Sequence, residues 1–217
     1  MPNPTLDIAN LMAMATKFSK IESSHKEPLL YGVDNGKTIG TYIEQKFQRY
    51  LFERFLFQVG NSANGIDFPT LGVDIKVTSA KQPQSSCPFK SARQKIYGLG
   101  YALLVFVYDK TDEPVARTST LAIAHTVFVE AAYTADYQTT KGIADILDRD
   151  GNEDDLIGFM GDRNLPLDDI QAQQLAIEIL TVRPIQGYLT ISNALQWRLQ
   201  YNRVIEQAGR VPGISRL

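Results

Sequence analysis

The sequence predicts an α/β protein whose mixed sheet is flanked by helices, followed by a small helical domain. Three observations carry this prediction. A helical stripe of apolar residues precedes a segment in which apolar and polar residues alternate as on a strand. A short unbroken apolar run follows, as expected for a strand buried on both faces. Beyond it the pattern is mostly helical, and we place a boundary close to Leu165, between residues 1–164 and 165–217.

The expected elements of the first domain alternate between helix and strand. They are, in chain order, helices at Thr5–Ser19 and Thr38–Phe57, short strands at Ile66–Phe68 and Val73–Thr78, a helix at Lys90–Tyr101, strands at Ala102–Tyr108 and Thr118–Glu130, and a helix near Thr140–Arg149. The turn-like Pro69–Gly72 would join the two short strands as a hairpin. Loops are expected at the polar Ser79–Phe89 and at the acidic, glycine-containing Asp150–Leu165.

The C-terminal segment is expected to be mainly helical. Asp168–Val182 has helical periodicity with Asp168 as an N-cap, and Gly187–Thr190 is short enough for a strand. Ile191–Ala208 offers two further helical segments.

Composition bounds the chemistry. The chain has one cysteine, Cys87, which we expect to be buried, and two histidines, so neither an internal disulfide nor a zinc site of usual spacing is available. We expect His125 to be a core histidine. The formal net charge is -2, so any contact with nucleic acid must rely on local basic clusters. No apolar run is long enough for a membrane span and no secretory signal begins the sequence, so we expect a cytoplasmic protein without a membrane partner.

The strand expected at Val73–Thr78 carries the chemistry. Side chains alternate along a strand, so Asp74 and Lys76 share a face, and Asp67 on the neighbouring strand reaches the same point. Phosphodiester hydrolysis needs neutralised phosphate charge and an activated water, which a divalent cation held by carboxylates provides. Asp67, Asp74 and the Ile75 carbonyl would hold Mg²⁺, and Lys76 would orient or deprotonate the attacking water.

A glutamate upstream extends this cluster. Glu44 lies one helical turn after Gly40, and it reaches the same point if its helix crosses the strand ends. The alternative is plain: an Asp-x-Lys pair on a strand is commonly a solvated edge. The joint presence of the second aspartate, the apolar Val-x-Ile-x-Val face and the glutamate helix favours a nuclease site.

These residues resemble the signature of the PD-(D/E)xK nucleases, in particular their type II restriction branch. The segment Gly65–Lys76 matches an acidic residue, a gap, and then Asp-x-Lys, with Glu44 on the preceding helix. The proline follows Phe68 rather than preceding Asp67, a departure from the pattern. The resemblance implies Mg²⁺-dependent cleavage of double-stranded DNA, a homodimer, a cognate DNA methyltransferase as a functional partner, and a polar residue, here Gln94, on the helix after the lysine strand.

Two groups of residues are candidates for DNA contact. A basic and polar cluster follows the lysine strand, and its alternative is a solvated loop and helix face; it comprises Lys81, Gln82, Gln84, Ser85, Lys90 and Arg93. The second lies in the run Leu195–Arg203, which resembles the winged helix that ends bacterial DNA translocases, with Arg198, Asn202 and Arg203 as contacts. Its alternative is a helix pair that packs on the first domain or forms a dimer contact.

Two other functions remain open from the sequence. One is a structure-specific or repair nuclease of the same superfamily, which would cut nicks, flaps or lesions rather than one short sequence. The other is a DNA-binding protein that keeps the fold without catalysis. Retention of Glu44, Asp67, Asp74 and Lys76 argues against the second.

Overall fold

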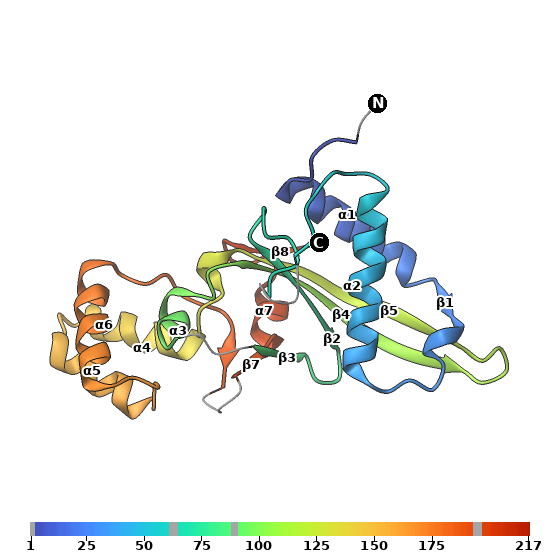
Figure 1. Cartoon of the computed structure of the whole chain (residues 1–217). Coiled ribbons are helices and arrows are strands. Elements are labelled where there is room, and N and C mark those ends of the chain that lie inside the picture. The colour runs from blue at the N-terminus through green and yellow to red at the C-terminus, as the bar shows by residue number, and fades with distance from the viewer. Residues whose placement is uncertain (1–2, 61–64, 88–90, 193–196) are drawn as a thin grey trace.

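The structure is a computed structural model of the chain, and it describes all residues except 1–2, 61–64, 88–90 and 193–196 (Figure 1). Its elements are, in chain order, α1 (Ile8–Glu22), β1 (Lys26–Glu27), the 3-10 helix η1 (Pro28–Leu30), α2 (Gly36–Phe52), β2 (Val73–Ser79), β3 (Gln84–Cys87), α3 (Arg93–Tyr97), β4 (Ala102–Glu113), β5 (Thr118–Val129), η2 (Ala131–Tyr133), α4 (Tyr137–Leu147), α5 (Glu153–Asp162), α6 (Asp169–Thr181), β6 (Thr190–Ile191), β7 (Trp197–Gln200), α7 (Asn202–Gln207) and β8 (Ile214–Arg216).

The larger sheet is mixed, as predicted. Its strand order is β1-β5-β4-β2, with β8 paired to β5. β2 runs parallel to β4, whereas β5 is antiparallel to β4, to β1 and to β8. β2 therefore stands at one edge of this sheet with only β4 as a strand partner among the described residues.

The sheet is buried on both faces. Leu104 and Phe106 of β4 pack into a cluster with α1 and α2, while Leu103 and Val105 enter a second cluster on the opposite face. The predicted two-sided burial of this apolar strand is confirmed. On the first face the ring of Phe106 lies 5.2 Å, centroid to centroid, from a phenylalanine of α2.

The hairpin expected before β2 is present only as a single bridge. Phe68 and Val73 form an isolated antiparallel pair around a tight turn, and the long partner of β2 is β4 instead. The strand expected at Thr118–Glu130 is confirmed as β5. The helix expected at Lys90–Tyr101 is confined to α3.

A second, three-stranded sheet corrects two predictions. The polar segment expected to be a loop contains β3, and the segment expected to be helical around Trp197 contains β7. The strand order is β3-β7-β6, with antiparallel pairing throughout. The expectation of two helical segments in Ile191–Ala208 is therefore wrong where β7 forms, and the winged helix is not confirmed: only the short α7 follows β7, and the chain then leads into β8, which pairs with β5.

Helices α3 to α6 gather at one end of the molecule, beside the sheets (Figure 1). The prediction of a loop at Asp150–Leu165 is wrong, because this segment contains α5. The helix begins with a capping box between Asn152 and Asp155. Leu156 and Leu165 enter one apolar cluster with residues of α3, α4 and α6. The boundary expected near Leu165 falls inside this cluster. Within the described residues, no helix is long and apolar enough to cross a membrane.

Candidate active site

Strand β2 brings the predicted carboxylate and lysine together. Asp74 Oδ2 lies 2.6 Å from Lys76 Nζ, and the Asp74 side chain is 5% exposed whereas that of Lys76 is 20% exposed. Val73 and Ile75 point to the other side, into the cluster under α1 and α2. Although burial disfavours the charged ammonium, the neighbouring Asp74 and Asp67 carboxylates raise the pKa of Lys76 above its ordinary value. Lys76 therefore stays charged at the site.

Asp67 joins this pair from the turn before β2. Its Oδ2 accepts a hydrogen bond from the Ile75 backbone N–H at 2.8 Å. Burial, together with a hydrogen bond shared with the Asp74 carboxyl, raises the pKa of Asp67 to about 7. The Asp67 carboxyl therefore keeps its proton to a higher pH than an ordinary aspartate does.

Helix α2 adds Glu44 and Gln48, which are four residues apart and therefore lie on one face of the helix. Burial raises the pKa of Glu44, the Lys76 ammonium lowers it, and the Asp74 carboxylate raises it, so Glu44 lies within electrostatic reach of both. Gln48 Nε2 lies 3.4 Å from Asp67 Oδ1. A Cβ added at Gly40 would meet Val77 Cβ at an ordinary 3.9 Å, so close helix packing does not require glycine there.

The donor set fits a divalent cation. Asp74 Oδ2 is buried, and beyond the ammonium at 2.6 Å no donor among the described residues meets it with hydrogen-bond geometry. The N–H and C=O of one strand residue point the same way, so the Ile75 carbonyl points to the side of β2 where Asp67 lies. In the described ranges, no three Asp, Glu, His or Cys side chains are close enough to form a metal site by themselves. The possible ligands are therefore two carboxylates and a backbone carbonyl.

Gln94 lies on α3, as predicted from the family pattern. Its Nε2 donates to the Leu99 carbonyl at 3.1 Å, and its buried Oε1 has no hydrogen-bond partner among the described residues. Within the described residues, Gln94 therefore makes no hydrogen bond to Asp67 or Asp74.

The first group of candidate DNA contacts is split by the structure. Lys81 and Gln82 are exposed, and Gln84 is half-buried on β3. Ser85 points the other way, and its Oγ lies 2.5 Å from the Tyr201 hydroxyl. Lys90 lies outside the described residues.

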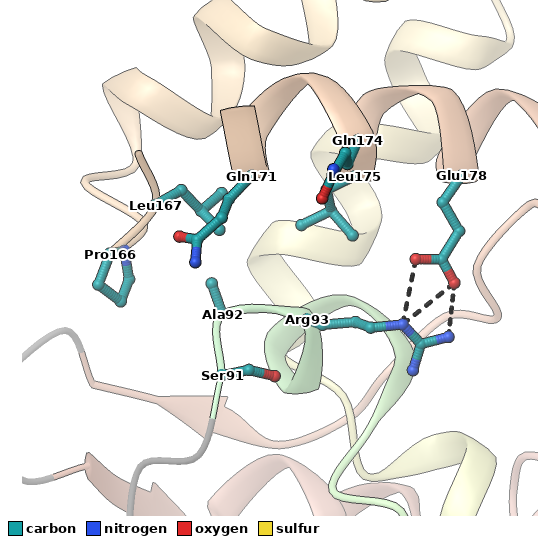
Figure 2. A pocket seen from close by; sticks show the side chains of 9 residues that line it. All are labelled: Ser91, Ala92, Arg93, Pro166, Leu167, Gln171, Gln174, Leu175 and Glu178. Carbon is teal, nitrogen blue, oxygen red and sulfur yellow. Dashed lines mark hydrogen bonds and ion pairs between the residues drawn. The ribbon is translucent and has the colours of Figure 1, made fainter. Parts of the chain in front are cut away.

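The Arg93 guanidinium is ion-paired with a carboxylate of α6. Its guanidinium donates to Glu178 in a bidentate contact of 2.5 to 3.1 Å at the rim of a cavity of about 370 Å³ between α3 and α6 (Figure 2). Because this contact neutralises the guanidinium, Arg93 presents less positive charge than the sequence suggested. None of the candidate catalytic residues lines this cavity.

The C-terminal candidates lie on different elements from those expected. Arg198 is exposed on β7, and Asn202 is exposed at the start of α7. Arg203 stacks on the ring of Tyr137, with its guanidinium carbon 3.7 Å from the ring centroid. The three residues therefore do not form one helical face.

Two site neighbours were missed from the sequence. Gln48 is signalled by its spacing of one helical turn after Glu44. The Tyr201 hydroxyl, which meets Ser85 beside the site, carries no local signal because its partner comes from a distant segment. The expected burial of Cys87 is confirmed at 1% exposure, whereas His125 is half-buried on β5 rather than in the core.

Comparison with known proteins gives one coherent result. Residues 5–216 match the family described as "Type II restriction enzyme NspV". The chain is 65% identical over 209 residues to the protein of that name from Nostoc sp. (strain ATCC 29411 / PCC 7524), an alignment that covers 96% of this chain and 95% of the relative. No solved structure matches significantly.

Proposed function

Because the chain belongs to the NspV family of type II restriction enzymes, and so is a site-specific deoxyribonuclease, we propose that Asp67, Asp74 and Lys76 form its hydrolytic centre. One observation carries this assignment. Two carboxyls and one ammonium converge at the edge of β2, with Lys76 Nζ 2.6 Å from Asp74 Oδ2 and Asp67 hydrogen-bonded to the same strand. Outside a functional site, a raised carboxyl pKa beside a second carboxyl is a cost to stability.

The cofactor of this centre would be Mg²⁺. Asp67, Asp74 and the Ile75 carbonyl would hold it, because hard oxygen donors are the ligands that Mg²⁺ prefers. When bound, the cation supplies neutralisation of phosphate charge and acidification of water.

The protein's own groups have separate tasks. Lys76, charged and partly exposed, donates hydrogen bonds to a phosphate oxygen or to the attacking water and so orients them. Asp67 gives up its proton near neutral pH, which prepares the pair of carboxylates for cation binding. Glu44 adds negative charge from α2, and Gln48 fixes the Asp67 side chain.

The order Glu44, Asp67, Asp74 and Lys76 supports membership in the PD-(D/E)xK superfamily. With it we propose a homodimer on double-stranded DNA, because two copies related by two-fold symmetry cut both strands of a palindromic sequence. A DNA methyltransferase that modifies the same sequence would protect the host. Lys81, Gln82 and Asn202 are exposed and remain candidates for DNA contact.

The test is digestion of unmethylated plasmid and phage DNA with Mg²⁺ by the wild type, Asp74→Asn and Lys76→Met. Discrete fragments are expected from the wild type, with a loss of at least about 10²-fold in rate for each variant. Asp109→Asn, exposed on the neighbouring β4, and Lys37→Met, exposed on α2, are the matched controls and should cut normally.

Undiminished cleavage by Asp74→Asn, with both controls folded, would contradict the assignment of the centre. Cleavage confined to nicked or flapped DNA would favour the structure-specific alternative instead.

A further inference from the structure

The small sheet β3-β7-β6 has two chemically distinct faces. Strand alternation sends one set of side chains inward, where Cys87, Trp197, Leu199 and Ile191 join the apolar cluster on the second face of the main sheet. Ser85 points the same way and meets the buried Tyr201 hydroxyl. The sheet is thereby fixed to the body of the protein.

The other face is entirely polar. Directly paired residues of an antiparallel sheet share a face. The register therefore aligns two rows across the three strands, here called the polar face: Gln84, Gln200 and Thr190 in one row, and Ser86, Arg198 and Ser192 in the next. Ser86, Arg198 and Gln200 are exposed, and the other three are half-buried.

The pairing brings the two glutamines close together. The Tyr201 N–H donates to the Pro83 carbonyl at 2.9 Å, which identifies Gln84 and Gln200 as a non-hydrogen-bonded pair, the closer of the two antiparallel arrangements. Arg198 lies two residues from Gln200 on the central strand, so the two side chains project side by side.

The donors and acceptors of this face suit base edges. Arginine binds guanine O6 and N7 in a bidentate way, glutamine binds adenine N6 and N7, and serine and threonine accept or donate to either. The polar face carries no carboxylate, and the Arg198 guanidinium makes no ion pair within the described part of the chain. This distinguishes Arg198 from Arg93, which Glu178 neutralises.

The polar face is tied to the catalytic strand. Thr78, two residues after Lys76 on β2, accepts a hydrogen bond from the Gln84 N–H at 2.9 Å and donates to the Gln84 carbonyl at 3.1 Å. Figure 1 shows β3 next to β2 and β7 next to β3, between the main sheet and the helices α3 to α6. A base held by the polar face is therefore positioned relative to Asp74 and Lys76 by a short path of hydrogen bonds.

We propose that the polar face is the sequence-reading surface of this enzyme, laid against base edges in the major groove, with Arg198, Gln84 and Gln200 as the specificity-determining side chains. Sheets and ribbons are established readers of the major groove. The proposal rests on the proposed function, since it names which part of the restriction enzyme selects the DNA sequence. The helical reading unit expected from the sequence is replaced by a strand-based one.

The experiment first maps the sequence that the wild type cuts, using plasmid digestion. Short duplexes with that sequence and with each single base-pair substitution then give kcat/KM for Arg198→Ala, Arg198→Lys, Gln84→Ala and Gln200→Ala. Arg149→Ala, exposed in the turn after α4, and Gln173→Ala, exposed on α6, are the matched controls. Thermal unfolding of each variant checks the fold, which outward-facing substitutions should leave intact.

Each alanine variant is expected to lose about 5- to 150-fold in kcat/KM on the mapped sequence, with relaxed discrimination at particular base pairs and not at others. Arg198→Lys should show the same relaxation with unchanged salt dependence, because lysine keeps the charge but loses the bidentate geometry.

Three results would overturn the proposal: wild-type specificity in all alanine variants, an equal loss on every duplex, or a salt slope reduced by about 1 in Arg198→Ala, the mark of a phosphate contact. Absence of cleavage by the wild type on every DNA would instead defeat the proposed function.

Discussion

Replacing Asp67 by asparagine separates the charge of this residue from its shape. In the wild type, burial and the neighbouring Asp74 carboxyl raise the pKa of Asp67 to about 7. An asparagine oxygen still accepts from the Ile75 N–H, and its amide donates to Asp74, so Asp67→Asn imitates the protonated carboxyl.

The direction in which stability changes with pH depends on whether the folded or the unfolded chain binds the Asp67 proton more tightly. The ordinary aspartate pKa of about 3.9 applies to the unfolded chain, so between pH 4 and 7 only the folded state keeps the proton. The stability that this proton contributes is fully present below about pH 4 and is lost as the pH rises through about 7. The upper bound is about 4 kcal/mol, from about three pKa units at 1.36 kcal/mol each. Asp67 is only partly buried, so solvent screening reduces the expected loss to about 1–3 kcal/mol.

The assay is urea unfolding in EDTA at pH 5, 6, 7 and 8. The free energy of unfolding of Asp67→Asn minus that of the wild type should grow with pH by the expected amount and level off above pH 8. Asp109→Asn, exposed on β4, should show no such growth. A pH-independent difference for Asp67→Asn would refute the reasoning. Added Ca²⁺ or Mg²⁺ should stabilise the wild type more at pH 8 than at pH 6, because cation and proton compete for the same oxygens.

Three further outcomes are expected. Gly142→Ala on α4 should destabilise the protein by about 1–3 kcal/mol in urea unfolding, since its Cβ would lie 2.3 Å from the Phe159 ring. The control Gly158→Ala on α5, whose Cβ would have no atom within 4 Å, should be neutral or stabilising by up to about 1 kcal/mol. Equal effects of the two substitutions would contradict this packing. Arg93→Ala should cost no more than about 1 kcal/mol and leave DNA affinity and its salt slope unchanged in a binding titration, because Glu178 already neutralises the guanidinium; a smaller slope would show a phosphate contact. Addition of EDTA should stop DNA cleavage and excess Mg²⁺ should restore it; persistent cleavage would exclude the metal.

The part of the site on β2 was readable from local sequence. Val73, Ile75 and Val77 alternate with Asp74, Lys76 and Thr78, and alternation fixes which side chains share a face wherever a strand forms. The apolar run Ala102–Tyr108 at the start of β4 was equally predictable, because its short length and unbroken apolar character suit a strand covered on both faces. The partner of β2 was not, since the parallel pairing with β4 depends on the intervening crossover.

The prediction of helices in the C-terminal part was wrong for a physical reason. Trp197, Arg198, Leu199 and Gln200 alternate between buried and exposed, but four residues fit a strand or one turn of helix equally well. Pairing with β3, far earlier in the chain, decides between them. Helix α5, by contrast, was predictable from the sequence, because Asn152 and Asp155 have the spacing of a capping box.

The border of β2 that faces away from β4 has a consequence for how the protein behaves at high concentration. A strand with free backbone groups at a sheet edge invites pairing with another chain and hence aggregation. Phe68 satisfies the first outward N–H of β2, and the Asp67 carboxyl satisfies the next, at Ile75. The same aspartate that is proposed to hold the cation thus also blocks a backbone N–H that another chain could pair with. If Asp67 has the proposed role, an apolar substitution there is expected to abolish cleavage and also to make the protein prone to form intermolecular sheets.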